Sequence, residues 1–462
     1  MMTTPDTHAI SLNPFNGQRI AEYPFDTALT LEMAVTQGSA AYKQWRKTDI
    51  AQRASHLHNL ATELRKASED ISRMISREMG KPIKQARAEV EKSASLCEWY
   101  ALQGPAMLAP EPTMVDNGVA HIHYRPSGMI LAVMPWNFPV WQILRGAVPA
   151  LLAGNTFLLK PAPNVMGTTR LVKQAALKAG FPAGAFGVIN VGNADVAGLI
   201  ADPRIVAVTV TGSVRAGGAI AELAGKSLKK CVLELGGSDP FIVLNGANLD
   251  EAVKAAVAGR YQNTGQVCAA AKRMIIEEGV LEAFTEKFVA ATRALVIGDP
   301  QDDDTYIGPM ARYDLRDELD RQVQETLSEG ATLLLGGEKI AGEGNFYAPT
   351  ILSNVTPQMT AFRQELFGPV AAITVARDAE HAVELANDSD FGLSATIYTA
   401  DLARAELMTD ELETGGVFIN GYSASDPRVA FGGVKKSGYG RELSHFGLRE
   451  FCNVQTVWSN RK

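Results

Sequence analysis

From Gly128 onwards, short apolar runs alternate with amphipathic stretches, and this alternation constrains the fold more than any other feature of the chain. It is typical of βαβ units, in which each strand is followed by a helix that covers the sheet. A first series of runs comprises residues 129–134, 157–159, 186–191, 205–210, 232–235 and 241–244. A second series follows Gly246 and comprises residues 274–277, 332–335, 370–375, 395–398 and 417–420. The sequence therefore predicts an α/β protein with two such domains.

Two other segments carry different patterns. The first hundred residues are predicted to be helical, because apolar residues such as Leu57, Leu60 and Leu64 recur every three or four positions among charged ones. Between Asp116 and Arg125, an Asp-Asn-Gly turn leads into an alternating His-Ile-His-Tyr segment, which predicts a hairpin outside the main sheets. We expect this hairpin to serve as a contact between subunits.

Composition and charge restrict the class of protein. The chain has 462 residues, 46% hydrophobic and 21% charged, with a net charge of −7, so we expect a folded globular protein that binds no nucleic acid. The most apolar stretch, residues 128–154, is interrupted by prolines and polar residues and is not expected to span a membrane. Residues 1–10 lack the basic and apolar regions of a secretory signal, and we expect a cytoplasmic location.

The cysteines and histidines do not predict a metal site. Cys97, Cys231, Cys268 and Cys452 show neither a C-x-x-C motif nor a disulfide framework, so reduced thiols are expected. The histidines include two H-x-H pairs, but no carboxylate or cysteine accompanies these pairs at the spacing of metal ligands.

The two standard glycine-rich phosphate-binding motifs are absent. The predicted strand 206–210 instead leads into Thr211-Gly212-Ser213 and then a predicted helix. Free amides at a helix N-terminus attract phosphate, but an ordinary turn between a strand and a helix explains the same residues. This segment alone leaves both interpretations open.

Polar residues at the ends of predicted strands are candidates for a site, because doubly wound sheets bind ligands at the carboxyl ends of their strands. Glu234 ends an apolar run, Asn137 follows another strand between two prolines, and Lys160 closes a third. Cys268 lies among small residues that leave space around its sulfur. From its own segment, Cys268 is either a nucleophile or a small hydrophobic core residue.

Seven short motifs follow one another along the chain: Pro135-Trp136-Asn137-Phe138-Pro139, Leu159-Lys160-Pro161-Ala162, Val210-Thr211-Gly212-Ser213, Leu233-Glu234-Leu235-Gly236-Gly237, Gly265-Gln266-Val267-Cys268, Glu365-Leu366-Phe367-Gly368-Pro369 and Phe431-Gly432-Gly433. Together they resemble the motifs of the aldehyde dehydrogenase superfamily, and the resemblance covers essentially the whole chain. The separations between Glu234, Cys268 and Glu365 also agree with the family pattern.

The resemblance implies the aldehyde dehydrogenase fold, with three parts. It implies a Rossmann-like NAD(P)-binding domain at residues 1–110 and 128–234 and an α/β catalytic domain at residues 235–435. Residues 111–127 and 436–462 would form a small β oligomerisation element. A homodimer or homotetramer is expected.

The resemblance also implies a mechanism. Cys268 would attack the aldehyde as a thiolate, aided by electropositive surroundings. The side-chain amide of Asn137 and the backbone N–H of Cys268 would bind the oxyanion of the resulting thiohemiacetal. After hydride transfer leaves a thioester, Glu234 would act as the general base for its hydrolysis.

For the cofactor, the resemblance implies NAD, bound along a groove at the sheet edge. Pro163 departs from the pattern, because many NAD-preferring members carry a glutamate there that would repel a 2′-phosphate, and NADP therefore remains possible. The implied contacts are Lys160 at the adenine ribose, Gly212 and Ser213 at the pyrophosphate, Leu235 near the nicotinamide, Glu365 and Phe367 at its ribose, and Trp136 along the groove.

Within the superfamily, the chain most resembles bacterial succinate-semialdehyde dehydrogenases. Arg145 stands where these enzymes have a substrate-binding arginine, which suits bidentate recognition of a carboxylate, although a solvated helix arginine explains it too. Gln262 replaces a second arginine found in some members, and Ser425 is a third candidate contact.

Alternatives of other classes remain open at this stage. One alternative is a cysteine hydrolase or acyltransferase, since thioester chemistry needs only Cys268 and a base. Another is a binding protein that retains the fold without catalysis. A nearer alternative is a dehydrogenase for glutarate semialdehyde or for short aliphatic aldehydes.

Overall fold

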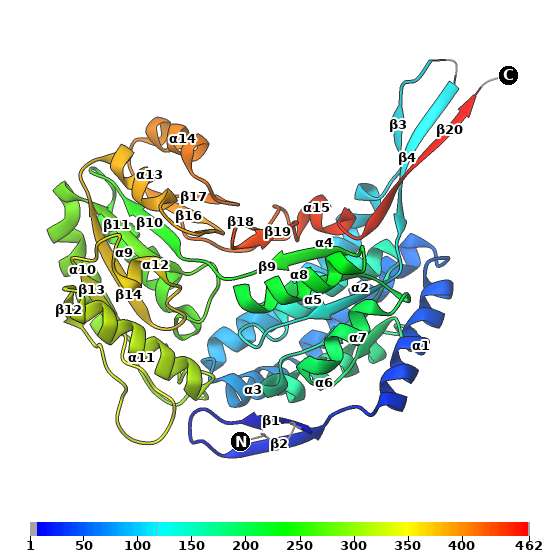
Figure 1. The fold of residues 1–462 in the computed structure, drawn as a ribbon, viewed down its shortest axis with the longest axis horizontal. Coiled ribbons are helices and arrows are strands. Elements are labelled where there is room, and N and C mark those ends of the chain that lie inside the picture. The colour runs from blue at the N-terminus through cyan, green and yellow to red at the C-terminus, as the bar shows by residue number, and fades with distance from the viewer. Residues whose placement is uncertain (1–6, 117, 461–462) are drawn as a thin grey trace.

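A computed structural model describes residues 7–116 and 118–460 and arranges them in two lobes from which a long arm projects (Figure 1). Residues 1–6, 117 and 461–462 lie outside the described residues. They include residues 1–6 of segment 1–10, which lacks the pattern of a secretory signal, and Asn117 at the centre of the predicted Asp-Asn-Gly turn.

The first lobe is built on a six-stranded sheet in the order β19-β9-β8-β5-β6-β7. All neighbours are parallel except the edge strand β19. The chain therefore leaves the central strand β5 first to one side and then to the other, as in a doubly wound sheet. The strands are β5 (Met129–Val133), β6 (Thr156–Lys160), β7 (Phe186–Val188), β8 (Ile205–Thr211), β9 (Lys230–Glu234) and β19 (Gly438–Tyr439).

Helices cover both faces of this sheet, because the side chains of successive residues in β5 are apolar and point to opposite faces. Ile130 and Ala132 belong to the core formed with α2 to α6, whereas Met129 and Leu131 pack in a second core with α1, α7 and α8. A strand buried on both faces carries a continuous apolar run. The helices are α1 (Ala28–Trp45), α2 (Ile50–Lys66), α3 (Ser68–Met79), α4 (Ile83–Met107), α5 (Trp141–Ala153), α6 (Met166–Lys178), α7 (Val196–Ala201) and α8 (Val214–Lys226).

The second lobe has a seven-stranded sheet in the order β12-β13-β14-β11-β10-β16-β17, in which only β12 is antiparallel to its neighbour. Its strands are β10 (Asp239–Val243), β11 (Ala271–Glu277), β12 (Thr332–Leu335), β13 (Thr350–Ser353), β14 (Val370–Ala376), β16 (Ala395–Tyr398) and β17 (Val417–Ile419). Its helices are α9 (Leu249–Tyr261), α10 (Leu281–Arg293), α11 (Tyr313–Ser328), α12 (Thr360–Arg363), α13 (Ala379–Asn387) and α14 (Leu402–Glu411). Two α/β sheets are thus confirmed, but residues 241–244, predicted in the first series, form β10 of the second sheet, and β13 was not predicted.

The arm is a three-stranded antiparallel sheet in the order β20-β4-β3 (Figure 1). It contains β3 (Glu111–Thr113), β4 (Gly118–Pro126) and β20 (Cys452–Asn460), and the short helix α15 (Ser444–Arg449) precedes β20. The predicted hairpin outside the main sheets is therefore confirmed, and the end of the chain adds its third strand.

The prediction of helix throughout the first hundred residues is wrong at its beginning. β1 (His8–Leu12) and β2 (Arg19–Pro24) form an antiparallel hairpin. Within β1, Ala9 and Ser11 are buried while their neighbours are exposed, which is the two-residue period of a strand. The short pair β15 (Phe391–Gly392) and β18 (Val434–Lys435) completes the strands.

No helix in the described part of the chain is both long enough and apolar enough to cross a membrane. The most apolar segment instead contains α5, a helix in which every residue is buried inside the first lobe.

Candidate active site

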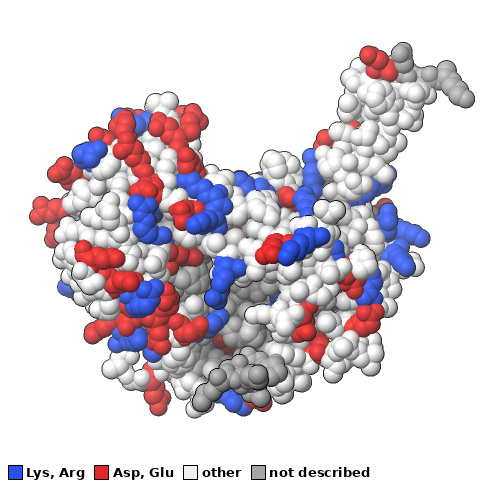
Figure 2. Space-filling view, in the orientation of Figure 1, with Lys and Arg blue, Asp and Glu red and all other residues white. Residues whose placement is uncertain are grey.

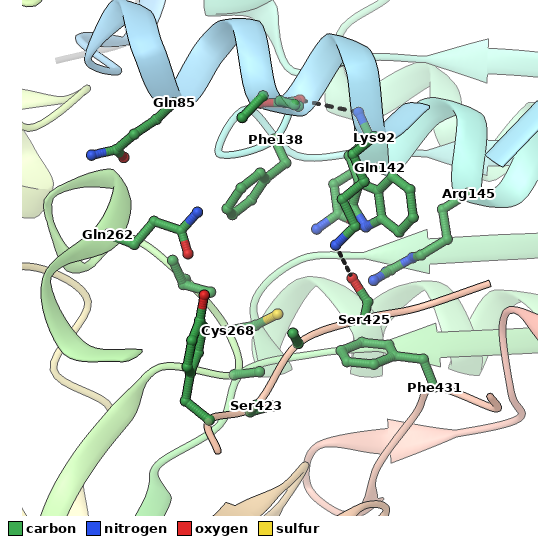
Figure 3. A pocket seen from close by; sticks show the side chains of 17 residues that line it. Gln85, Lys92, Phe138, Gln142, Arg145, Gln262, Cys268, Ser423, Ser425 and Phe431 are labelled. Atoms are coloured by element: carbon green, nitrogen blue, oxygen red, sulfur yellow. Dashed lines mark hydrogen bonds between the residues drawn. The ribbon is translucent and has the colours of Figure 1, made fainter. Parts of the chain in front are cut away.

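A cavity of about 260 Å³ lies where α4, α5, the segment before β11 and the segment after β17 meet (Figure 3). Three predicted substrate residues, Arg145, Gln262 and Ser425, line it together with Cys268. The structure therefore brings these residues into one site. The rest of its lining is Gln85, Ala88, Glu89, Lys92, Phe138, Trp141, Gln142, Val267, Ala269, Tyr422, Ser423, Ala424 and Phe431.

Cys268 is half-buried in a loop that buried polar groups hold in place. The amine of Lys272 donates hydrogen bonds to the carbonyls of Val267 (2.9 Å) and Cys268 (2.6 Å). Just upstream, Asn263 and Thr264 have φ angles of 54° and 55°, a conformation that costs about 1–3 kcal/mol per residue and is common near functional sites.

The surroundings of the Cys268 thiol oppose its ionisation despite two nearby cations. Arg145 and Lys272 lower its pKa, as the predicted electropositive surroundings require, but the larger effect of burial raises this pKa to about 11. The thiol is therefore protonated at neutral pH. A nucleophile in this position needs a base to take its proton.

Glu234 is the last residue of β9, and its side chain is buried. Neither carboxylate oxygen has a hydrogen-bond partner among the described residues. Burial raises the pKa of this carboxyl to about 8, although the nearby charge of Arg145 lowers it. A group that titrates near neutral pH is suited to accept a proton in catalysis.

Asn137 follows β5 and is held by hydrogen bonds at both its side chain and its backbone. Its Nδ2 donates to the carbonyl of Gln266 (3.0 Å), and its own carbonyl accepts from Lys81 (2.9 Å) and Asn263 (2.9 Å). An amide nitrogen carries two hydrogens, so the second hydrogen on Nδ2 remains for a ligand.

Arg145 is completely enclosed, which rules out the alternative of a solvated helix arginine. Its guanidinium forms an ion pair with Glu442 and lies 4.9 Å from the centroid of the Phe431 ring. Phe431 and Glu442 are themselves joined by two backbone hydrogen bonds of 2.8 Å. The sequence predicted Arg145 but not this partner.

Other buried charges of the site escaped sequence analysis. Lys81 and Glu89 form a buried ion pair, and Glu89 also accepts the backbone N–H groups of Val140 (2.8 Å) and Trp141 (3.0 Å). A carboxylate at the first turn of α5 satisfies free amides there. Position 89 continues the buried periodicity of α4, which is the one local signal of its burial.

The predicted cofactor residues lie along the carboxyl edge of the first sheet rather than in the cavity lining. Lys160 ends β6, Gly212 follows β8, and Ser213 caps α8 by accepting a hydrogen bond from Ala216 N (3.3 Å). Pro163 begins a short 3-10 helix and is exposed. This edge includes the switch point between β5 and β8, where open α/β sheets bind their ligands.

The remaining cofactor candidates lie between the two lobes. Glu365 forms an ion pair with Lys272 (3.1 Å) and accepts the N–H of Gly237 (3.1 Å). The rings of Trp136 and Phe367 meet edge to face with centroids 5.8 Å apart. Leu235, the residue after Glu234, is buried in the core that β8 and β9 form with α8.

These residues fit a dinucleotide, but the backbone N–H of Gly212 is not available to a phosphate. Its N–H donates to the carbonyl of Glu234 (3.0 Å) and is not free for a phosphate. However, a Cβ built on Gly212 would have no described atom within 4 Å, so the turn leaves space for a ligand. We infer that Gly212 contributes this space rather than a hydrogen bond.

Comparison with known proteins agrees with this geometry. Residues 2–457 match the aldehyde dehydrogenase family. The chain belongs to the aldehyde dehydrogenase family. The fold is that of this family, and the motifs that led to the resemblance surround the cavity and the adjoining sheet edge.

Relatives and solved structures match along the full length. The chain is 65% identical over 461 residues to the NAD(P)+ succinate semialdehyde dehydrogenase Sad of Escherichia coli strain K12, with 100% of both chains covered. It is 43% identical to the NADP(+) succinate-semialdehyde dehydrogenase 1 of Mycobacterium ulcerans, covering 96% of this chain and 98% of that one. A crystal structure of succinic semialdehyde dehydrogenase from Streptococcus pyogenes with NADP+ matches at a TM-score of 0.96 and 35% identity, covering 98% of this chain and 100% of that one.

Replacing Glu234 tests the burial of its carboxylate. Folding raises the pKa of this group from 4.5 to about 8, so its ionisation opposes folding between these values. As pH rises from about 5 to about 8, wild-type protein loses stability that the Glu234→Gln variant keeps. We expect the variant to melt close to wild type at pH 5 and at a higher temperature at pH 8.5, measured by calorimetry.

The exposed Glu406 in α14 provides the control. Glu406→Gln should follow the wild type at both pH values. If the melting temperatures of Glu234→Gln and wild type change in parallel with pH, Glu234 is not a buried, unpaired carboxylate.

Proposed function

We propose that this aldehyde dehydrogenase oxidises succinate semialdehyde to succinate with NAD or NADP. The observation that carries the proposal is that one cavity joins the thiol of Cys268 to a wall that carries cationic side chains. A semialdehyde with a terminal carboxylate is complementary to this arrangement. The 65% identity to the E. coli enzyme over the full chain supports the same substrate and cofactors.

In the proposed reaction, Cys268 attacks first. Glu234 in its ionised form accepts the thiol proton, directly or through water, and the sulfur bonds to the aldehyde carbon. The carbonyl oxygen becomes an oxyanion, to which the free N–H of Asn137 Nδ2 and the backbone N–H of Cys268 donate. Loss of one such donor typically lowers the rate by about 10²–10³-fold.

The bound NAD(P) supplies the hydride acceptor that turns the thiohemiacetal into a thioester. Glu234 then removes a proton from a water molecule, whose oxygen attacks the thioester carbon. The carbon–sulfur bond breaks, succinate leaves, and Cys268 recovers a proton. A carboxyl with a pKa of about 8 holds and returns these protons without a histidine.

We assign the cofactor to the carboxyl edge of the first sheet and to the adjoining residues that contact the second lobe. Lys160 and Ser213 would hold the adenine ribose and the pyrophosphate, with Gly212 leaving room for the latter. Trp136, Leu235, Glu365 and Phe367 would enclose the nicotinamide end. The domain limits then stay as predicted, with the cofactor domain at residues 1–110 and 128–234 and the catalytic domain at residues 235–435.

We further propose that the predicted oligomerisation element, residues 111–127 and 436–462, joins subunits into a dimer or tetramer through the arm formed by β3, β4 and β20. β20 is an edge strand whose residues after Cys452 are all exposed. They include Val454 (59%), Val457 (40%) and Trp458 (57%), and most of the arm surface in Figure 2 carries no charge. Exposed apolar edge strands are prone to pair with another chain.

The free thiols suit a cytoplasmic location, which we also propose.

The proposed reaction predicts a preference between two aldehydes of equal length. Initial rates of NAD(P)H formation should give a kcat/KM for succinate semialdehyde about 10–150-fold above that for butanal, because a charged contact contributes about 1.5–3 kcal/mol. Cys268→Ala should abolish both reactions. Equal rates would contradict succinate semialdehyde as the substrate, and turnover without NAD(P) would indicate a hydrolase.

Because Pro163 carries no negative charge, we predict that the enzyme accepts NADP as well as NAD. Pro163→Glu places a carboxylate near the proposed adenine ribose site, where it repels a 2′-phosphate. We expect kcat/KM with NADP to fall about tenfold, or ~1.4 kcal/mol, with little change for NAD. Pro163→Gln, of the same shape without the charge, should leave the NAD-to-NADP ratio near wild type. Equal effects of both variants would contradict this position of the cofactor.

The exposed apolar strand of the arm predicts that the protein is an oligomer at micromolar concentration. Native mass spectrometry should show a dimer or tetramer for wild type, and Trp458→Asp should shift it toward monomer by burying a charge in the interface. Leu177→Asp, at an exposed apolar position on α6 (52%), is the matched control. A wild-type monomer at micromolar concentration would contradict the proposal.

A further inference from the structure

Lys92 lies in the cavity wall, and the sequence analysis did not single it out. It belongs to α4, and its amine donates a hydrogen bond to Ser425 Oγ (2.9 Å; Figure 3). The same amine lies 4.1 Å from the centroid of the Trp141 ring. Lys92, Ser425 and Trp141 thus form one polar corner of the cavity that holds Cys268.

The charges around the cavity leave Lys92 without an anion. Among the described residues, no carboxylate lies within 4.0 Å of its amine. The neighbouring carboxylates are engaged elsewhere: Glu442 with Arg145, Glu89 with Lys81, and Asp426 with Arg428. A half-buried cation with no ion-pair partner is costly in a protein, and a bound anion would remove this cost.

We infer that Lys92 and Ser425 together bind the terminal carboxylate of the substrate, and that Lys92 makes the enzyme selective for carboxylated aldehydes. This inference rests on the proposed function, whose substrate carries such a group. It adds Lys92 to the side chains of the cavity wall that can bind a carboxylate.

The hydrogen-bond donors that Lys92 and Ser425 keep free support the inference. An ammonium has three N–H donors, and Ser425 occupies one of those of Lys92. Because Ser425 accepts that bond, its own O–H is left to donate to a carboxylate oxygen. Burial lowers the pKa of Lys92 to about 8, so the amine is still mostly charged at neutral pH.

Arg145, unlike Lys92, already has an ion-pair partner. Its charge faces Glu442, and it also lowers the pKa values of Cys268 and Glu234. Its guanidinium is therefore already paired with a carboxylate, whereas the amine of Lys92 contacts only the neutral groups Ser425 and Trp141.

Lys92→Met tests the inference because it keeps the aliphatic stem and removes the charge. We expect kcat/KM for succinate semialdehyde to fall about 10–100-fold, mostly through KM, while kcat/KM for butanal stays within about twofold. Lys92→Arg should recover part of the loss. Lys84→Met, at an exposed position of the same helix, should change neither substrate.

Product binding gives a second readout. Succinate should raise the melting temperature of wild type and of Lys84→Met, but not that of Lys92→Met. An equal loss with both aldehydes, or undiminished discrimination in Lys92→Met, overturns the inference and leaves the proposed function intact. A wild type that oxidises both aldehydes equally overturns the proposed function and the inference together.

Discussion

The buried ion pair between Arg145 and Glu442 is the interaction on which the site depends. It joins α5 of the first lobe to the segment that precedes the arm, and it places a positive charge beside Cys268 and Glu234. Removing one partner of such a pair typically costs about 3–5 kcal/mol, because the other charge is left buried alone. The pair therefore stabilises the contact between segments, and the charge of Arg145 partly offsets the effect of burial on the pKa values of Cys268 and Glu234.

The connection between the two sheets gives the site its position. Glu234 ends β9 in the first sheet, and Asp239 begins β10 in the second. Cys268 precedes β11, the neighbour of β10. The proposed base and nucleophile consequently stand at the border of the lobes, next to the carboxyl edge where a doubly wound sheet binds its ligand.

Local patterns predicted most strands of both sheets, because a strand covered on both faces is a continuous apolar run, but β13 and β19 were not predicted. They missed the hairpin of β1 and β2, whose two-residue period is short and lies in a region where helical spacing dominates. Motif resemblance predicted Cys268, Glu234, Asn137 and Arg145. It did not predict Lys92 or Glu442, since neither belongs to a motif and each matters only through partners distant in the chain: residue 425 for Lys92 and residue 145 for Glu442.

The central claim is that Cys268 carries the substrate as a thioester that Glu234 releases. Intact-mass spectrometry of wild type, quenched with acid during turnover of succinate semialdehyde and NAD, tests it most directly. The account predicts that part of the protein carries the mass of one succinyl group on the peptide that contains Cys268, and that Glu234→Gln, which lacks the base, turns over far more slowly than wild type. Turnover of Glu234→Gln at the wild-type rate, or a succinyl group on another residue, would contradict it.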